Sequence, residues 1–377
     1  MSGRLRVSAV LIVRDEEAFL TACLDSIRAH VDEIVVVDTG STDRSIQIAK
    51  SFGATLLERE WRHDFAWARN EGLAAASGDW LLYIDADERL TVPAGADLRD
   101  NLAGDDVFAA NLGFRPWFNA TPYREHRLFR NDPRLRFRGA MHETLLPDLS
   151  TLQRTIGARV TESPVEIVHY GYEPGSEWKH ARNLPLLRQA IADHPERLYY
   201  WFHLAQTLAG LGEIDEAIAV GREGLKRASR ADRWANDDVI GTMIAMTHAR
   251  LLHERGEDAL PVVAQGLALY PRNPSLELLK ARILVDLGRT DEALPILEAL
   301  AATDSASYRD PRLAHDRRIF DVHAHDLLGV VLLKLGRREA AARSFALAAA
   351  AAPDEPSYRI KALALGRGSP LVQTNPQ

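Results

Sequence analysis

Residues 80–88 read Trp-Leu-Leu-Tyr-Ile-Asp-Ala-Asp-Glu, an apolar run of strand length that ends in three carboxylates. Carboxylates placed this close together repel one another, and each requires water or a partner of opposite charge. One explanation is a solvated acidic turn after a buried strand, since acidic residues are common in turns. The other is a divalent metal that carries a phosphate ligand, because hard cations bind carboxylate oxygens and substrate phosphates together. The rest of the chain decides between the two.

Three similar apolar runs come earlier, at 7–13, 33–38 and 54–58, and a helical pattern follows each of them. The last of these helices is predicted at 65–77 and ends at Gly78, directly before the fourth strand. Strands that alternate with helices predict a doubly wound, mostly parallel, Rossmann-like sheet, so the first half of the chain is of the α/β class. Ligands bind outside the carboxyl ends of the strands in such a sheet.

Polar clusters stand at three of these carboxyl ends. They are residues 14–16 (Arg-Asp-Glu), the segment Asp38–Asp43 and the segment Asp85–Glu88. Within the second cluster, Gly40 permits a tight turn, and Ser41 or Thr42 can cap the helix that follows. Because the topology gathers all three clusters at one edge of the sheet, a binding site is favoured over a solvated acidic turn.

The region from 93 to 174 has a less regular pattern. Strands are predicted at 107–114, 125–129 and 165–169. A run of arginines between 115 and 138 makes a basic stretch in an otherwise acidic protein. This stretch is either a solvated face or a rim that meets an anionic substrate.

Beyond residue 178 the pattern is almost wholly helical, with a loose repeat in which a glycine separates two helical stretches. The region from about 195 to 355 resembles tetratricopeptide repeats, with Trp201 and Ala205 near consensus positions of the first repeat. Stacked helical hairpins of this kind form a concave surface that usually holds peptide or protein. The repeated glycines are Gly212, Gly256, Gly288 and Gly336.

The first ~175 residues resemble a family 2 glycosyltransferase with the GT-A fold. The resemblance rests on four motifs in the order and spacing of the family. Two positions depart from its pattern, since Thr39 stands where aspartate is common and Asp15 stands where asparagine is common. Neither departure removes an indispensable group. The motifs are Leu11–Glu17, Val37–Asp43, Ala66–Asn70 and Asp85–Glu88.

The resemblance implies a donor site at the strand ends. Asp38 would accept a hydrogen bond from the nucleotide base, most often uracil. Arg69 would approach the base or the diphosphate, because a guanidinium matches phosphate oxygens in a bidentate way; its alternative is an exposed helix face. The donor-binding residues implied in this way are Val13, Arg14, Glu16, Asp38, Ser41, Arg69, Asp85, Ala86 and Asp87.

The same resemblance implies a divalent metal, Mg²⁺ or Mn²⁺, that bridges the diphosphate. Asp87 is the first candidate ligand, and Asp85 would act directly or through water. His169 ends a predicted strand and resembles a late histidine that completes metal or diphosphate binding in some GT-A enzymes; otherwise it is structural. Glu88 would orient the neighbouring carboxylates or the sugar.

An inverting transferase also needs a base that takes the proton of the acceptor. Glu143, in the sequence Met141-His142-Glu143, is the candidate catalytic base, and its alternative is a structural or acceptor-orienting role. His142 would ligate the metal or orient Glu143.

The resemblance implies an inverting, metal-dependent hexosyltransferase that moves a sugar from a nucleotide-sugar, and a UDP-sugar is the expected donor. The repeats would present a peptide or protein acceptor with a Cys or Ser/Thr side chain, as in the bacterial peptide S- and O-glycosyltransferases that the chain resembles. One alternative is an acceptor that is a cell-envelope glycan or lipid. Another is a catalytically dead scaffold that binds protein partners through its repeats.

The predicted domain limits are 1–176 for the GT-A domain, 177–194 for a junction helix, 195–365 for the repeats and 366–377 for a flexible tail. A net charge of −7 argues against nucleic acid as a partner. The single cysteine, Cys23, fits a reducing compartment. Because no signal peptide and no apolar run of membrane-spanning length are evident, we expect a cytoplasmic protein without stable membrane insertion. Exposed ends of repeat arrays often self-associate, which favours a homodimer.

Overall fold

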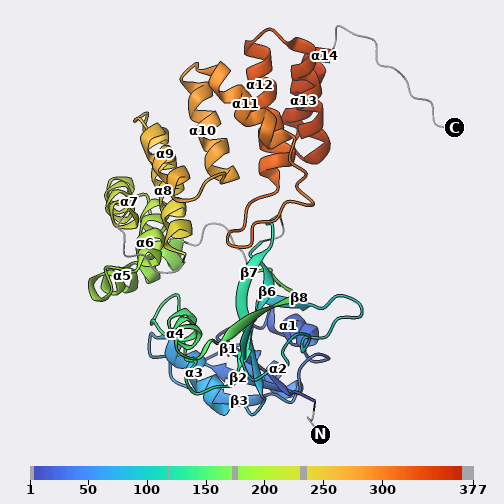
Figure 1. Cartoon of the computed structure of the whole chain (residues 1–377), viewed down its shortest axis with the longest axis vertical. Coiled ribbons are helices and arrows are strands. Elements are labelled where there is room, and N and C mark those ends of the chain that lie inside the picture. The colour runs from blue at the N-terminus through green and yellow to red at the C-terminus, as the bar shows by residue number, and fades with distance from the viewer. Residues whose placement is uncertain (1–3, 118, 172–176, 230–235, 367–377) are drawn as a thin grey trace, which may run out of the picture. The chain divides into compact units, whose positions relative to one another are not determined.

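A computed structural model describes residues 4–117, 119–171, 177–229 and 236–366 of the chain. It divides into two compact units, Met1–Pro174 and Gly175–Gln377 (Figure 1). The first unit contains a sheet with helices packed against it, and the second contains helices alone in its described part. The predicted change from an α/β pattern to a helical one therefore occurs in the structure.

The first unit is built on a mixed sheet of eight described strands in the order β3-β2-β1-β4-β7-β6-β8-β5. Strands β3, β2, β1 and β4 run parallel to one another, whereas β7 is antiparallel to both β4 and β6. Strand β8 runs parallel to β6 and antiparallel to β5. The α/β class is confirmed, with the parallel arrangement concentrated in one half of the sheet. In sheet order, the bounds are Thr55–Glu58, Glu33–Asp38, Val7–Val13, Trp80–Tyr83, Tyr123–Arg130, Val107–Arg115, Arg159–His169 and Glu88–Thr91.

Helices cover both faces of the parallel half. Helices α1 (Leu20–Ile27) and α2 (Ser45–Ser51) belong to one core cluster, which includes the buried side chains of Leu11 and Trp80. The helices on the other face are α3 (Phe65–Ala75) and α4 (Leu146–Ile156), and their core includes Val10 and Val35. Strand β1 is apolar on both faces because each of them meets a helical layer.

Two elements were missed by the sequence interpretation. Strand β5 begins at Glu88, directly after the acidic turn, and its Glu-Arg-Leu-Thr sequence has no apolar run. Helix α4 carries the ordinary signals of a helix, with proline in its first turn and Gly157 at its C-terminal end with a φ of 69°. Strand β8 also begins six residues before the predicted start at Val165.

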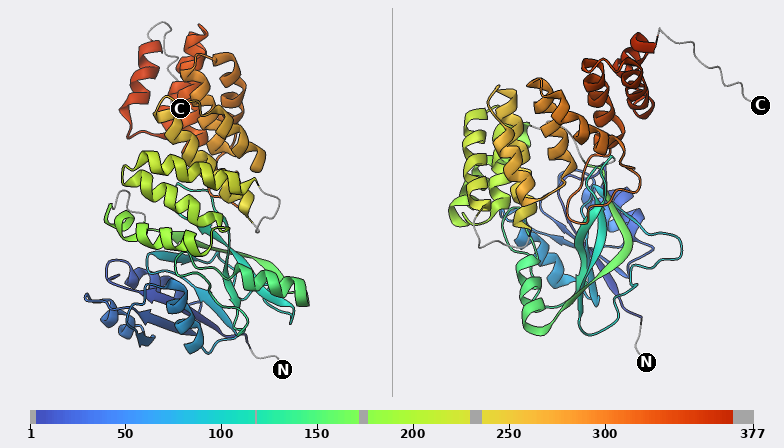
Figure 2. Two further views of the ribbon diagram at one scale, coloured as in Figure 1. Left: turned by 90° about the vertical axis from the view of Figure 1, so that its left-hand side faces the viewer. Right: turned by 45° about the horizontal axis from the view of Figure 1, so that its top comes forward.

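The second unit consists of helices α5 to α14 and a short π-helical turn, η1, in its described residues (Figure 2). The four repeat glycines follow α6, α8, α10 and α12, and all have positive φ values between 74° and 80°. Such backbone conformations favour glycine, which explains the repeat signal. The bounds are α5 Glu177–Asp193, α6 Leu198–Gly210, α7 Ile214–Ala228, α8 Asp237–Glu254, α9 Leu260–Leu269, α10 Pro274–Asp286, α11 Thr290–Ala301, η1 Ile319–His323, α12 Ala324–Lys334, α13 Arg338–Ala351 and α14 Pro356–Gly366.

Within the described ranges, the chain has no helix that is both long enough and apolar enough to cross a membrane. Helix α14 ends at Gly366, and the remainder of the predicted tail, 367–377, lies outside the described residues.

Helix α3 approaches the sheet through Gly72. A Cβ atom at this position would lie 2.5 Å from Cγ1 of Val10 and 3.1 Å from Cγ2 of Val37. We therefore expect Gly72→Ala to lower the free energy of unfolding by about 1–3 kcal/mol, through overpacking between α3 and the sheet. Ala74→Ser, on the exposed face of the same helix, should change it by no more than about 0.5 kcal/mol. Urea unfolding of the full chain measures both, and an unchanged Gly72→Ala variant would contradict the close approach.

Candidate functional site

The loops that follow β1 and β2 are joined by hydrogen bonds at the carboxyl edge of the sheet. The backbone N–H of Asp15 donates to Oγ of Ser41 over 3.0 Å, and Oδ1 of Asp15 accepts from the N–H of Thr42 over 2.7 Å. Asp15 has a φ of 54°, a conformation that aspartate and asparagine tolerate better than most residues. The first two predicted clusters thus form one surface.

Asp38 stands at the end of β2 and is almost completely buried, with 2% of its surface exposed. Its Oδ1 accepts hydrogen bonds of 3.0 Å from the backbone N–H groups of Gly40 and Ser41. Its Oδ2 is buried and has no hydrogen-bond partner in the described part of the chain. Because a buried carboxylate oxygen without a partner is costly, this atom is suited to accept a hydrogen bond from a ligand.

The other predicted residues of this loop pair differ in exposure. Val13 is buried, and its carbonyl accepts a hydrogen bond from the N–H of Thr39 over 2.9 Å. This carbonyl therefore joins the ends of β1 and β2. The side chain of Arg14 is 55% exposed and lies 4.0 Å from Asp15. The N–H of Glu16 donates to Oγ of Ser45 over 2.8 Å, at the start of α2.

The turn Asp85–Glu88 is held by a buried ion pair. Glu88 has a side chain that is 2% exposed, and its Oε2 accepts from the N–H of Asp85 over 2.8 Å. Arg127, on β7, donates to both carboxylate oxygens of Glu88 over 2.9 and 3.0 Å. The guanidinium of Arg127 lies 4.5 Å from the ring centroids of both Tyr83 and Phe114. Glu88 therefore orients the turn, and Arg127 orients Glu88.

Arg127 is a residue of this site that the sequence interpretation did not single out. Burial raises the pKa of the Glu88 carboxyl, and the charge of Arg127 opposes that rise. Arginines of the stretch to which Arg127 belongs form hydrogen bonds with other groups of the same domain. Arg124 and Arg130, for example, donate to the backbone carbonyls of Ser163 and Val107. The sequence signal that could have pointed to Arg127 is the run of arginines between 115 and 138, which overlaps strand β7.

Arg69 links the acidic turn to the candidate base. Its side chain is 8% exposed, and it pairs with Asp85 over 2.9 Å and with Glu143 over 2.5 Å. Partial burial raises the pKa of the Asp85 carboxyl, but the charges of Arg69 and Arg127 outweigh this effect and lower the pKa below its usual value. The guanidinium expected to approach a nucleotide thus holds two carboxylates of the protein.

Asp87 and His169 meet at the same edge from different strands. Nε2 of His169 lies 3.0 Å from Oδ2 of Asp87, and Nδ1 lies 2.9 Å from the carbonyl oxygen of Pro116. Burial lowers the pKa of His169, but the hydrogen bond to Asp87 and its charge raise it to about 9. Each ring nitrogen of His169 thus lies within hydrogen-bonding distance of an oxygen atom. The side chains of Asp87 and His169 are both about one quarter exposed.

Backbone contacts fix this pair. The carbonyl of Asp87 accepts from the N–H of Tyr170 over 2.8 Å, and Glu88 lies opposite His169 in the β5–β8 register. A Cβ atom on Gly171 would lie 2.0 Å from Oδ2 of Asp87, so glycine is required there. Ala86, between the two aspartates, is 3% exposed.

The candidate catalytic pair His142 and Glu143 lies in a closed loop. Arg138 and Thr144 exchange two backbone hydrogen bonds of 3.0 Å at the base of this loop. His142 has a φ of 53°, and the side chain of Glu143 is 12% exposed. Among the described residues, no group of three or more His, Cys, Asp or Glu side chains could hold a metal. Asp87 and His169, which lie 3.0 Å apart at this edge, are both residue types that can ligate a divalent metal.

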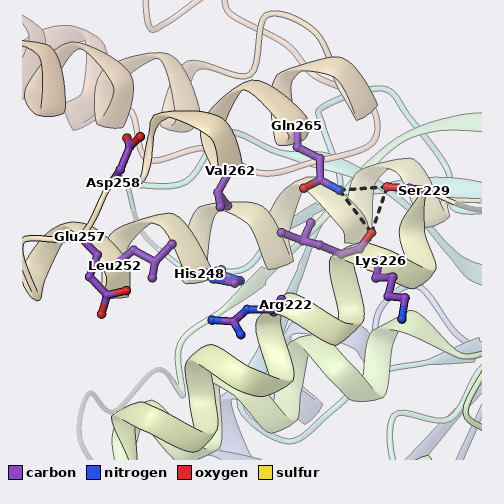
Figure 3. Close-up of a pocket in the computed structure, with 10 residues that line it drawn as sticks. Arg222, Lys226, Ser229, His248, Leu252, Glu257, Asp258, Val262 and Gln265 are labelled. Atoms are coloured by element: carbon purple, nitrogen blue, oxygen red, sulfur yellow. Dashed lines mark hydrogen bonds between the residues drawn. The ribbon is translucent and has the colours of Figure 1, made fainter.

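A separate cavity of about 570 Å³ lies in the second unit between α7, α8 and α9 (Figure 3). Arg222 and Lys226 contribute positive charge to its lining, and Glu257 and Asp258 contribute negative charge. Gln265 crosses one end and donates to Oγ of Ser229 over 2.9 Å. All of the predicted site residues lie in the first unit, so this cavity is distinct from the strand-end carboxylates.

The sequence model of glycosyl transferase family 2 matches residues 8–143, from strand β1 to the loop that carries Glu143. Residues 8–143 form a family 2 glycosyltransferase domain. Tetratricopeptide repeat models match residues 180–232 and 250–315 of the second unit. The predicted combination of a glycosyltransferase domain with helical repeats is confirmed.

Relatives share parts of this arrangement. A TPR repeat-containing protein of Synechococcus elongatus is 39% identical over 231 residues, which cover 59% of this chain and 57% of the relative. The prophage-derived glycosyltransferase SunS of Bacillus subtilis is 26% identical over 223 residues, or 56% of this chain and 51% of SunS. The chain spans about half the length of these curated relatives. Among solved structures, the chain is similar to glucosyl-3-phosphoglycerate synthase from Mycobacterium tuberculosis in complex with Mn²⁺ and UDP-glucose. The superposition covers 50% of this chain and 78% of the synthase chain, with 18% identity and a TM-score of 0.37.

The buried pair in the glycosyltransferase domain gives a stability prediction. Arg127→Met should lower the free energy of unfolding by about 3–5 kcal/mol, because it leaves the Glu88 carboxylate buried and unpaired. Adding Glu88→Gln should recover part of the loss by removing that charge. The matched control is Arg159→Met, which breaks the exposed pair with Asp106 and should change stability little. Urea unfolding compares the three, and equal effects of Arg127→Met and Arg159→Met would contradict the assigned role.

Proposed function

We propose that the chain is an inverting, metal-dependent glycosyltransferase that moves a hexosyl group from a UDP-sugar to a side chain of a peptide or protein. The observation that carries the proposal is the Asp87–His169 pair at the carboxyl edge of the sheet, within a family 2 glycosyltransferase domain. Its ligand chemistry suits the diphosphate end of a nucleotide-sugar. Asp38, on the neighbouring loop, suits the base end.

The donor set fits a divalent metal that is shared with substrate. Mg²⁺ in particular is usually held by one or two protein ligands together with phosphate oxygens and water. His169 is already oriented for such a role, because its Nδ1 is bound to the carbonyl of Pro116 and its Nε2 faces Asp87. Asp87 and His169 would hold the ion, and Asp85 would support it from its pair with Arg69. A metal bound there would offset the charge that builds on the departing diphosphate.

Asp38 supports recognition of a nucleotide base. Its buried Oδ2 lacks a partner, and its Oδ1 is fixed by two backbone N–H groups. An acceptor that is fixed and desolvated suits the single imide N–H of uracil. The exposed side chain of Arg14 on the adjoining loop adds positive charge for the diphosphate.

Glu143 is the proposed base on the acceptor side. A bond forms between the acceptor sulfur or oxygen and the anomeric carbon as the bond from that carbon to the diphosphate breaks. The acceptor proton passes to Glu143. Arg69 holds the Glu143 carboxylate in place, and its second contact, to Asp85, ties the base to the donor-side turn. His142 adjoins Glu143 in the same loop and would orient the acceptor group or the base.

The repeat unit supports a peptide or protein acceptor. Stacked helical hairpins commonly bind extended peptides, and two stretches of this unit match tetratricopeptide repeats. A glycan or lipid acceptor and a scaffold without activity are the competing proposals. They differ in what the protein does with a donor and with an acceptor.

Turnover of a donor panel tests the enzymatic part. With Mn²⁺, the full chain should release UDP from at least one UDP-sugar, and Asp87→Asn should slow this release by at least about 100-fold, because a metal ligand is lost. Asp132→Asn is the matched control, since this carboxylate pairs with the exposed Arg134. UDP release that is independent of metal, or unaffected by Asp87→Asn, would overturn the proposal. A lack of release from every donor would favour the scaffold.

Mass spectrometry of acceptor reactions tests the acceptor class. Peptides that contain Cys, Ser or Thr and are encoded beside the gene should gain one hexose in the presence of the preferred donor. Replacing Cys by Ser in the modified peptide distinguishes S- from O-linkage. Transfer confined to lipid or glycan acceptors would refute the peptide assignment while leaving the donor chemistry intact.

A further inference from the structure

Helix α3 is bound to the segment 137–143 at three positions. The N–H of Phe65, in its first turn, donates to the carbonyl of Ala140 over 2.9 Å. Arg69 pairs with Glu143, and the next residue, Asn70, reaches Phe137. The two segments are far apart in the sequence, so these bonds fix the position of the acceptor-side loop relative to the sheet.

The contact made by Asn70 is the most specific of the three. Its Nδ2 donates to the carbonyl of Phe137 over 3.0 Å, and its Oδ1 accepts from the N–H of the same residue over 2.9 Å. One side-chain amide thus supplies both hydrogen bonds that a neighbouring strand would otherwise give to this backbone. The Phe137 side chain is 4% exposed, which makes an unpaired backbone at this point costly.

The position of Phe137 determines where the candidate base can lie. Residue 138 closes the loop by its two backbone bonds to Thr144, and Glu143 directly precedes that closure. The Phe137 ring also packs at 5.1 Å from the ring of Tyr83, the last residue of β4. A shift of Phe137 would therefore move Glu143 relative to the carboxylates that follow β4.

We propose that Asn70 is a positioning residue that fixes the 137–143 segment and, through it, the Glu143 carboxylate. Only the expected effect on sugar transfer rests on the proposed function. The hydrogen bonds themselves and their effect on the loop are independent of the reaction. Arg69 and Asn70 then have separate roles. Arg69 pairs with the Glu143 carboxylate, and Asn70 binds the backbone of the 137–143 segment.

Asn70→Ala tests the assignment with two readouts on the full chain. Hydrogen exchange at the Phe137 amide should accelerate, because the variant removes its acceptor. The kcat for sugar transfer should fall by about 10²-fold, as expected for a displaced catalytic group, while the Kd for UDP with Mn²⁺ stays unchanged. If Asn70→Ala fails to fold, Asn70→Asp serves instead, since it keeps the acceptor and loses only the donor to the Phe137 carbonyl. That variant should keep the Phe137 amide protected and still lower kcat.

Asn131→Ala is the matched control. Asn131 also binds backbone carbonyls near α3, those of Ala76 and Gly78, but at the other end of the helix. It should lower stability without changing kcat or exchange at Phe137. Normal kcat in Asn70→Ala, or an equal loss in Asn131→Ala, would overturn the positioning role. Absence of turnover in the unaltered protein would instead contradict the proposed function, and slow exchange at Phe137 in Asn70→Ala would still refute the contact.

Discussion

The site depends on the need to keep several carboxylates together at the end of one short strand. Asp85, Asp87 and Glu88 lie within one four-residue segment after β4, and Glu143 joins them through Arg69. Two buried arginines make this arrangement stable. Arg127 neutralises Glu88 between two aromatic rings, and Arg69 bridges Asp85 and Glu143. Without these cations, the carboxylates would repel one another in a setting with little water.

This division of charge leaves Asp87 in a distinct position. Glu88 and Asp85 are paired with buried arginines, whereas Asp87 faces a histidine. The side chains of Asp85 and Asp87 are both partly exposed, whereas that of Glu88 is buried. The acidic turn is therefore part structural and part available to a ligand. The same logic applies to Asp38, where one oxygen holds the loop and the other is free of protein partners in the described chain. In both cases the protein holds one carboxylate oxygen, and the proposed function assigns the group a further contact with the donor or its metal ion.

Patterns local in the sequence predicted much of this architecture. The apolar runs of β1, β2 and β4 and the glycines between repeat helices were readable because each depends on a few neighbouring residues. The pairs Glu88–Arg127 and Arg69–Glu143 were not readable, since they join positions 39 and 74 residues apart through the tertiary fold. Strand β5 was missed for the same reason: its first residue is a carboxylate that is buried only because Arg127 pairs with it.

Calorimetric titration of the full chain with UDP tests the central claim most directly. Donor binding through Asp87, His169 and a shared divalent ion requires that UDP bind in the presence of Mn²⁺ and bind much more weakly in EDTA, because the diphosphate then meets the acidic turn without the ion. Equal affinity in both conditions, or no binding in either, would contradict the assignment of this edge as a nucleotide-sugar site.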